Sequence, residues 1–290
     1  MRRKNALIPK ITVGIPLYKS GTWLPVIREN LVALSGNARV IVSDVDEHDD
    51  TLRQLTEEFA GEPDFEFIGQ RALATGWAHH CNDLKSRATT DYFMWLPHDD
   101  SIGSDWVQKG VAALDQNPTA SIAFGSMILQ NVSLGTELEL EFQPDNSRPE
   151  ARDRLLEAFR RQFVTRHPAL GHAFRGIQRR ELTGLLPTES SPEVSREPGW
   201  KADVFWAVNA LSRGPFVATT AVYRKRIGIE TTSSSWPGEN LTPGFRHELL
   251  RAAESLSLED RYFIAATMWG DEAIRYRRAL NAAKKREEKP

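Results

Sequence analysis

The stretch YFMWLPHDD, residues 92–100, joins an apolar run to a proline, a histidine and two aspartates. Its apolar part, residues 92–97, has the composition of a strand that is buried on both faces of a parallel sheet. Helical patterns flank it over residues 75–88 and 105–118, and a proline stops the second. A strand between two helices is the repeating unit of an α/β sheet, so the two acids are expected where the strand ends.

The same alternation extends toward the N-terminus. Further strands are predicted at residues 11–15, 38–44 and 65–69, and helices at residues 22–34 and 51–60. Strand and helix therefore alternate through the first 118 residues, which predicts a doubly wound, mostly parallel sheet. In such sheets ligands bind beyond the carboxyl ends of the strands. Both acidic segments, residues 44–51 and 97–100, fall there.

The pattern changes after residue 130. An acidic stretch at 135–150 precedes a charged amphipathic helix, and a loop rich in proline and serine is expected at 186–199. The remaining predicted elements are a strand at 121–129, helices at 151–164 and 200–214, a strand at 215–226, and one or two helices after Leu256. We expect three parts: 1–130, 131–255 and a helical tail, 256–290.

The composition is that of a globular protein, with 290 residues, 40% of them hydrophobic and 26% charged. The formal net charge of -2 gives no electrostatic reason to expect nucleic acid as a partner. Cys81 is the single cysteine, which excludes an intrachain disulfide and a cysteine-based zinc site. The basic N-terminus has an apolar patch far shorter than a membrane span of roughly 20 residues. We expect a cytoplasmic protein without a transmembrane segment, and leave open a peripheral membrane contact through basic patches.

Acidic segments at neighbouring strand ends suit a nucleotide whose phosphates carry a divalent cation. Mg²⁺ and Mn²⁺ prefer oxygen ligands, often one or two carboxylates with substrate phosphates. The histidines at 79, 80 and 98 lack a zinc-site spacing. The sequence has no glycine-rich dinucleotide loop, no GK[ST] phosphate loop, no HExxH and no GxSxG, which argues against an NAD enzyme, a P-loop kinase and a serine hydrolase.

Three blocks resemble the inverting family 2 glycosyltransferases of the GT-A fold, in that family's order and spacing. They are VGIPLYKSGTWL (13–24), RVIVSDVDEHDDT (39–51) and RALATGWAHHCNDLKSRATTDYFMWLPHDDSI (71–102). The resemblance implies a mostly parallel twisted sheet flanked by helices, with a helical C-terminal extension. It also implies that residues 1–130 bind a nucleotide sugar, and that residues 131–255 form the acceptor-binding and catalytic half of the same domain.

The resemblance implies a donor site built from strand ends and from the basic segment YRKR, 223–226. Its members are Pro16, Tyr18, Asp44, Asp46, Arg71, Gly76, Asn82, His98, Arg224 and Arg226. Pro16 and Tyr18 would lie beside the nucleobase, and Asp44 would accept a hydrogen bond from it. Gly76 would permit close backbone approach. An arginine fork suits phosphate oxygens, so Arg224 or Arg226 would share the diphosphate charge.

The family's metal motif, D-x-D, is altered in this chain. Pro97 stands at the first acid, His98 in the middle and Asp99 at the metal-binding acid, and Asp100 follows. Since proline has no side-chain ligand, Mn²⁺ or Mg²⁺ would rest on Asp99, with Asp100 in support, and on the donor diphosphate. We therefore expect a weak metal site.

WKADVFWAVNALSRGPF, residues 200–216, resembles the family segment that carries the catalytic carboxylate. Asp203 is then the candidate base, with Ala202 where the family usually has another acid. Trp200 and Trp236 are candidate acceptor contacts, whereas tryptophans 77, 95, 106 and 206 are expected in the core. The implied reaction is inverting, metal-assisted transfer from a UDP-, GDP- or dTDP-sugar to an unidentified acceptor hydroxyl.

Two alternatives stay open at the sequence level. The replacements Pro97 and Ala202 allow a non-catalytic GT-A-like module that binds a nucleotide sugar. A sugar-phosphate nucleotidyltransferase is less well supported, because its glycine-rich signature after the first strand is absent. The acids also have structural explanations: Asp44, Asp99 and Asp100 as helix-cap or turn residues, and Asp203 as a surface acid.

Overall fold

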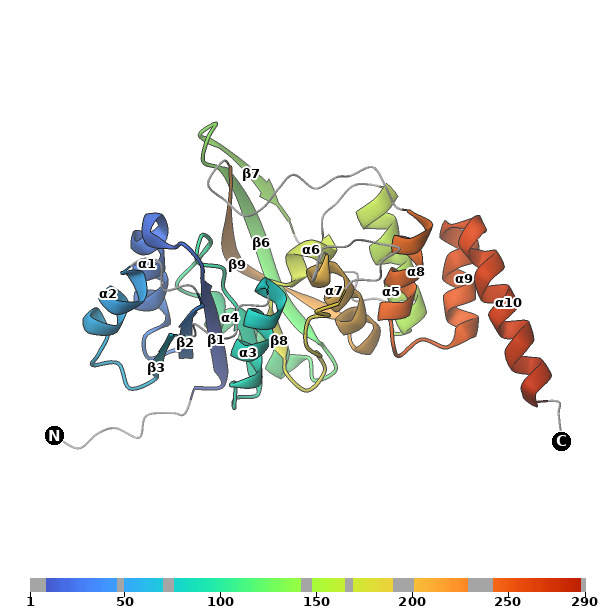
Figure 1. Cartoon of the computed structure of the whole chain (residues 1–290), viewed down its shortest axis with the longest axis horizontal. Helices are drawn as coiled ribbons and strands as arrows, with labels where there is room; N and C mark the ends of the chain where they lie inside the picture. The colour runs from blue at the N-terminus through green and yellow to red at the C-terminus, as the bar shows by residue number, and fades with distance from the viewer. Residues whose placement is uncertain are drawn as a thin grey trace.

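The computed structural model of the chain describes residues 9–45, 50–69, 76–141, 148–164, 169–189, 201–228 and 242–287. Within these ranges nine strands form one sheet (Figure 1), with β7 paired to β6 beside the path β3-β2-β1-β4-β8-β6-β9-β5. Its first half is parallel throughout and consists of β1 (Ile11–Leu17), β2 (Arg39–Asp44), β3 (Phe65–Gly69) and β4 (Tyr92–Trp95). The predicted α/β fold with a mostly parallel central sheet is confirmed.

The second half of the sheet is mixed. It contains β5 (Ser101–Ile102), β6 (Ile122–Asn131), β7 (Thr136–Leu140), β8 (Ile177–Arg179) and β9 (Phe216–Ile227). The short β8 runs antiparallel to both of its neighbours, β4 and β6, whereas the long strands β6 and β9 are parallel. β5 pairs antiparallel with β9 directly after the two aspartates, which ties the end of the first half to the last strand.

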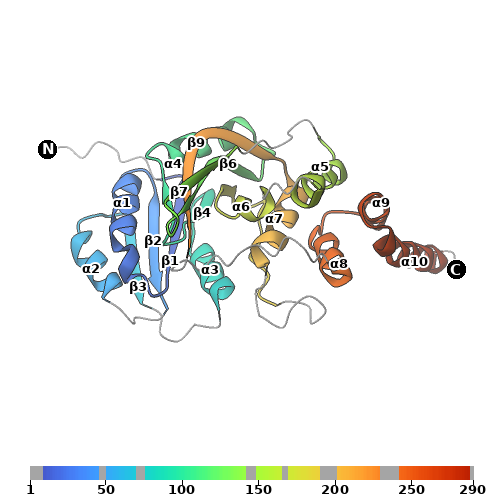
Figure 2. The same cartoon turned by 90° about the horizontal axis from the view of Figure 1, so that it is seen from above.

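Helices cover both faces of the sheet and bury a separate apolar core on each. One face carries α1 (Leu24–Leu34), α2 (Thr51–Glu58) and α4 (Trp106–Gln116). The other carries α3 (Trp77–Ser86), α6 (Ala169–Ala173) and α7 (Ala202–Arg213). Figure 2 shows α1 and α3 on opposite sides of β1 and β2. β4 serves both cores because its side chains alternate: Phe93 and Trp95 face α3 and α7, and Tyr92 and Met94 face the other layer.

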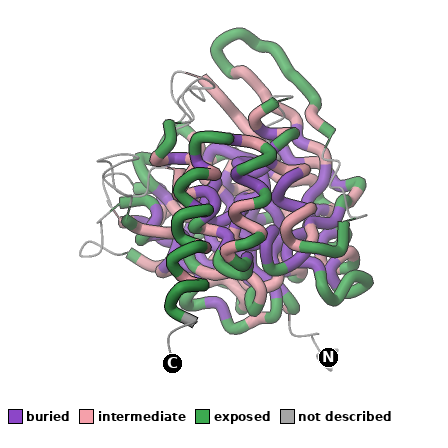
Figure 3. The backbone as a smooth tube through the Cα atoms, turned by 90° about the vertical axis from the view of Figure 1, so that its right-hand side faces the viewer, coloured by how far each residue is buried: buried purple, intermediate pink, exposed green. Residues whose placement is uncertain are grey.

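A helical extension continues the second core. It consists of α5 (Ala151–Phe159), which runs on as a π-helical turn (Arg160–Val164), and of α8 (Pro243–Ala252), α9 (Leu258–Met268) and α10 (Gly270–Glu287). Trp269, between α9 and α10, and Tyr276 of α10 join the buried cluster. The outer side of α10 is exposed (Figure 3). No helix in the described part of the chain is long and apolar enough to cross a membrane.

Several local predictions need correction. β1 continues through Pro16 to Leu17, which is possible because β4 pairs with β1 only as far as Gly14, so that the missing N–H of Pro16 breaks no bond on that side. The acidic stretch after 130 contains an unpredicted strand, β7, whose residues are almost all exposed. Trp77 is 44% exposed rather than buried, whereas the other three tryptophans expected in the core are buried.

Candidate functional site

The carboxyl ends of β1, β2 and β4 lie side by side where the strand order reverses. β1 has β2 on one side, with Leu17 opposite Asp44, and β4 on the other. His98 follows β4, and its Nδ1 lies 3.2 Å from the carbonyl oxygen of Pro16. Asp44 is buried, and Tyr18, directly after β1, is 48% exposed. Such a switch point is the usual ligand crevice of an open α/β sheet, and four predicted donor residues lie at or directly beside these strand ends.

The other predicted donor and acceptor residues have different surroundings. Gly76 precedes α3 with φ of 115°, a conformation that favours glycine, and a Cβ there would meet no atom within 4 Å. Asn82 uses its amide on the chain itself: its Nδ2 donates to the Leu186 carbonyl at 2.8 Å and its Oδ1 accepts from the Leu186 N–H at 2.7 Å. Four predicted residues lie outside the described ranges: Asp46, Arg71, Trp200 and Trp236.

The two neighbouring aspartates differ sharply, and Asp100 is the one that is fully engaged. Its side chain is 1% exposed, and its Oδ2 accepts hydrogen bonds from the Arg175 Nε and the Tyr223 hydroxyl, both at 2.8 Å. Its Oδ1 accepts from the Arg226 backbone N–H at 3.0 Å. Burial, and then the charge of Asp100, raise the pKa of Tyr223 well above its usual value, so the phenol remains a donor. Asp100 therefore joins the end of β4 to β9 and to Arg175.

Asp99 is buried, at 6% exposed, but its carboxylate is not engaged in this way. In the described part of the chain, no other residue donates a hydrogen bond to the Asp99 carboxylate; the Arg226 guanidinium donates only to the Asp99 backbone carbonyl. Burial, and then the charge of Asp100, raise the pKa of Asp99, while His98 and Arg175 oppose the shift. A buried carboxylate that receives no hydrogen bond from another residue is costly in its ionised form, and a cation would offset that cost.

A divalent cation fits this site through one side chain. Mg²⁺ and Mn²⁺ are commonly held by one or two carboxylates together with substrate phosphates, and Asp99 can supply one. Pro97 offers no ligand atom, and both Asp100 oxygens already accept hydrogen bonds. Over the described ranges, no group of three or more His, Cys, Asp or Glu side chains could hold a metal by itself. Among the acids of this motif, the Asp99 carboxylate is therefore the one available to a cation.

Asp203 lies in the first turn of α7 and is half-buried. Its charge acts on Arg175 and on Lys225, and both of these cations also interact with Asp99 and Asp100. The charge of Arg175, and then burial, lower the pKa of Lys225 to about 8, while the three aspartates oppose the shift. The structure thus brings the candidate base and the candidate metal ligand into one charged cluster around Arg175.

Sequence reasoning missed Arg175 and Lys225. Arg175 is one of several arginines in its segment, and nothing local distinguishes it. Lys225 could have been recognised from the sequence, because side chains alternate along a strand and Lys225 therefore lies on the same face as the aromatic residue Tyr223. The arginines predicted beside it are placed differently: Arg224 is exposed, and the Arg226 guanidinium donates to the Asp99 carbonyl and the Ser101 hydroxyl, both at 3.3 Å.

A buried lysine on α3 holds the chain segment that leads toward α7. The Lys85 ammonium lies 2.5 Å from Gln178 Oε1, 2.7 Å and 3.0 Å from the carbonyl and hydroxyl oxygens of Thr183, and 2.7 Å from the Gly184 carbonyl. Burial, and then the charge of Arg180, lower the pKa of Lys85 to about 6. Together with Asn82, Lys85 holds residues 183–186 against α3.

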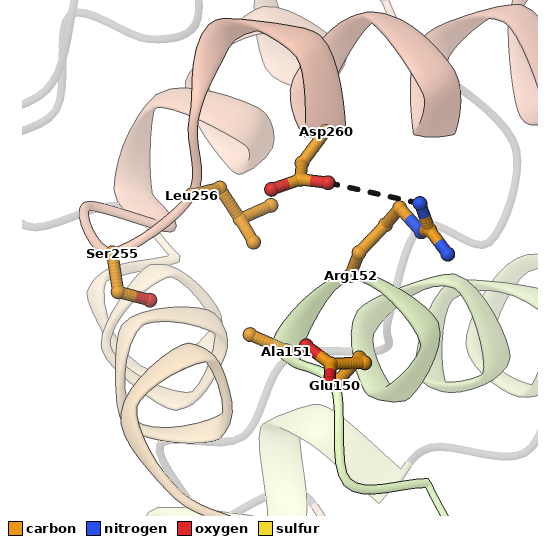
Figure 4. A pocket seen from close by; sticks show the side chains of 6 residues that line it. All are labelled: Glu150, Ala151, Arg152, Ser255, Leu256 and Asp260. Carbon is orange, nitrogen blue, oxygen red and sulfur yellow. Dashed lines mark ion pairs between the residues drawn. The ribbon is translucent and has the colours of Figure 1, made fainter.

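A separate hollow of about 360 Å³ lies between the start of α5 and the connection from α8 to α9 (Figure 4). Its lining residues are Glu150, Ala151, Arg152, Ser255, Leu256 and Asp260. Arg152 and Asp260 face each other across it at 3.9 Å. None of the predicted site residues lines this hollow, so it is distinct from the crevice at the strand ends.

The mostly parallel sheet flanked by helices, with acids at its switch point, matches the GT-A fold of glycosyltransferases that use nucleotide sugars. The Glycosyl transferase family 2 model matches residues 12–174, more than half of the chain. The chain therefore belongs to glycosyl transferase family 2 and is a glycosyltransferase. No curated protein matches the chain.

Solved structures with a similar fold include S. aureus TarS. The TarS fragment 1–349 has a TM-score of 0.58 and 14% sequence identity, covering 97% of this chain and 75% of that one. The same fragment in complex with UDP-GlcNAc has a TM-score of 0.58 and 17% identity, covering 89% and 71%. A complex of the fragment with UDP is also similar, at a TM-score of 0.58 and 14% identity, covering 89% and 70%. At these identities the likeness concerns the fold.

Proposed function

We propose that this glycosyltransferase moves the sugar of a nucleoside-diphosphate sugar to an acceptor hydroxyl, with inversion at the anomeric carbon. The observation that carries the proposal is the convergence of Asp203 and Asp99 on the cluster around Arg175, beside the strand-end crevice. TarS structures contain UDP and UDP-GlcNAc, so UDP-sugars are the first donors to test, followed by GDP- and dTDP-sugars.

Asp203 acts as the general base. Its carboxylate takes the proton of the acceptor hydroxyl as that oxygen attacks the anomeric carbon. The bond from that carbon to the phosphate oxygen breaks in the same step, and the nucleoside diphosphate leaves with the electron pair. One displacement inverts the configuration, and it needs one carboxylate on the acceptor side. Asp203 suits this role because it is half-buried within a charged cluster and none of the described residues forms an ion pair with it.

Asp99 is the residue that would hold a divalent cation together with the donor diphosphate. When bound, Mn²⁺ or Mg²⁺ supplies positive charge against the negative charge that develops on the leaving group. Asp100 supports this arrangement indirectly, since its ion pair with Arg175 and its bond to the β9 backbone hold the cluster together. Pro16, Tyr18 and Asp44, at or directly after the ends of β1 and β2, are the residues against which the nucleoside would lie.

The test is the substitution Asp203→Asn. Because positioned base catalysis contributes about 10²- to 10⁴-fold, turnover should fall on that scale, while UDP affinity measured by calorimetry stays unchanged. Asp105→Asn is the matched control, since Asp105 is an aspartate whose side chain is 45% exposed and pairs with Lys109 at 2.6 Å. Turnover is measured as nucleoside diphosphate released from the donor with acceptor present. Near-normal turnover of Asp203→Asn would show that another group removes the proton.

A further inference from the structure

Strand β9 presents three consecutive basic residues at the edge of the charged cluster, and they are not equivalent. Side chains of a strand alternate between its faces, so Lys225 shares a face with Tyr223, whose hydroxyl contacts Asp100 at 2.8 Å. Arg224 is exposed and stands opposite Ser101 in the β5–β9 pairing. The Arg226 guanidinium donates to the Asp99 carbonyl and to Ser101.

Lys225 lies among the acids without being paired to one. Its ammonium is within electrostatic reach of Asp99, Asp100, Asp203 and Arg175. Over the described ranges, however, no hydrogen bond or ion pair uses it, because Asp100 is already paired with Arg175 at 2.8 Å. Arg175 has the largest electrostatic effect on Lys225, and it is repulsive: its charge, and then burial, lower the pKa of Lys225 to about 8.

An unpaired, half-buried ammonium beside a second cation is an arrangement that an anion stabilises. The carboxyl ends of β1, β2 and β4 lie next to this cluster, since His98, shortly after β4, contacts Pro16 while Asp100 contacts β9. A donor lying in the crevice would bring its most negative part, the diphosphate, toward Asp99 and Lys225. A lysine ammonium has three donors for phosphate oxygens and serves as a point charge.

We infer that Lys225, rather than Arg224 or Arg226, binds the diphosphate of the donor. Its positive charge compensates for the weak cation site that the altered metal motif provides. This inference rests on the proposed function. With Pro97 in place of an acid, a divalent cation at Asp99 would have few protein ligands. The Lys225 ammonium would therefore share in neutralising the negative charge of the diphosphate. Diphosphate recognition should therefore persist when divalent cations are removed, and it should depend on Lys225.

The experiment measures binding, which separates Lys225 from any loss of turnover. UDP, GDP, dTDP and inorganic pyrophosphate are titrated by calorimetry into the full chain, first in EDTA and then with Mn²⁺. UMP and uridine are titrated in the same way, so that the ratio of the UDP and UMP affinities gives the contribution of the second phosphate. The variants are Lys225→Met, Lys225→Arg, Arg224→Met and the surface control Lys109→Met, each first shown to be folded by its melting temperature.

In EDTA, Lys225→Met should weaken binding of the preferred nucleoside diphosphate by about tenfold or more, the worth of one charge-assisted hydrogen bond, and leave uridine binding unchanged. Lys225→Arg should recover part of the loss, and Lys109→Met should lie within about twofold of the wild type. Binding by folded Lys225→Met within twofold of the wild type would overturn the inference alone, as would a larger loss in Arg224→Met. If the wild type bound none of the nucleotides, the proposed function would fail together with it.

Discussion

Replacing Asp100 by asparagine is the sharpest test of the difference between the two adjacent acids. Asp100→Asn keeps the shape of the side chain but removes its charge, and it turns one acceptor oxygen into an NH₂ donor. Three donors converge on the native carboxylate: the Arg175 Nε, the Tyr223 hydroxyl and the Arg226 N–H. An amide can serve at most part of this set, and the buried Arg175 guanidinium loses its counter-charge.

The expected cost follows from burial. The side chains of the pair are 1% and 13% exposed, so solvent screens little of the interaction. Removing one partner of a buried ion pair costs about 3–5 kcal/mol, most of it because the other charge stays buried and unpaired. For a domain of this size about 1 kcal/mol corresponds to roughly 2–4 °C, so the melting temperature should fall by roughly 6–20 °C.

The neighbouring residue supplies the matched comparison. The pKa of Asp99 is raised, so at pH 7 its ionised form opposes folding, and Asp99→Asn should melt at the wild-type temperature or above it. That variant should instead lose the Mn²⁺-dependent part of nucleoside-diphosphate binding. Calorimetric melting at pH 7 and UDP titration with Mn²⁺ measure the two effects. The reasoning is refuted if Asp99→Asn is the destabilised variant while Asp100→Asn melts like the wild type.

Two further predictions concern buried groups of α3. Burial lowers the pKa of His80 to about 4 in the folded protein, against about 6.5 in the unfolded chain. Protonation therefore favours the unfolded chain, so the free energy of unfolding is at its full value above about pH 6.5 and falls as the pH drops from about 6.5 toward 4. The free energy of unfolding, measured with urea, should fall by roughly 3 kcal/mol over this pH range. If His80→Gln showed the same pH dependence as the wild type, the prediction would be wrong. Lys85→Met removes the donor of the buried Thr183 carbonyl oxygen, whereas the Gly184 carbonyl keeps the Trp206 indole N–H. The variant should cost about 2 kcal/mol, whereas Lys109→Met should cost at most about 1 kcal/mol. Equal stabilities of the two variants would contradict the structural role of Lys85.

Much of the fold is predictable from local sequence. The apolar runs at 11–15, 38–44, 65–69 and 92–97 form strands, and the amphipathic segments between them form helices, because burial on a sheet imposes a periodicity that each segment carries by itself. The exposed strand β7 escaped prediction because it buries almost nothing and exists through its pairing with β6. Trp77 shows the same limit, since a tryptophan's type does not tell whether neighbours cover it.

By itself the sequence determined the strand-end position of the acids, the altered motif at Pro97 and the family. Only the tertiary structure identified the donors that occupy the Asp100 carboxylate, because these partners lie 75 to 126 positions away in the chain. The same distance in sequence hid Lys225 and the Asn82 contact with Leu186. A carboxylate's role is set by burial and by which donors reach it, and these are properties of the packed chain that residue types and spacing do not contain.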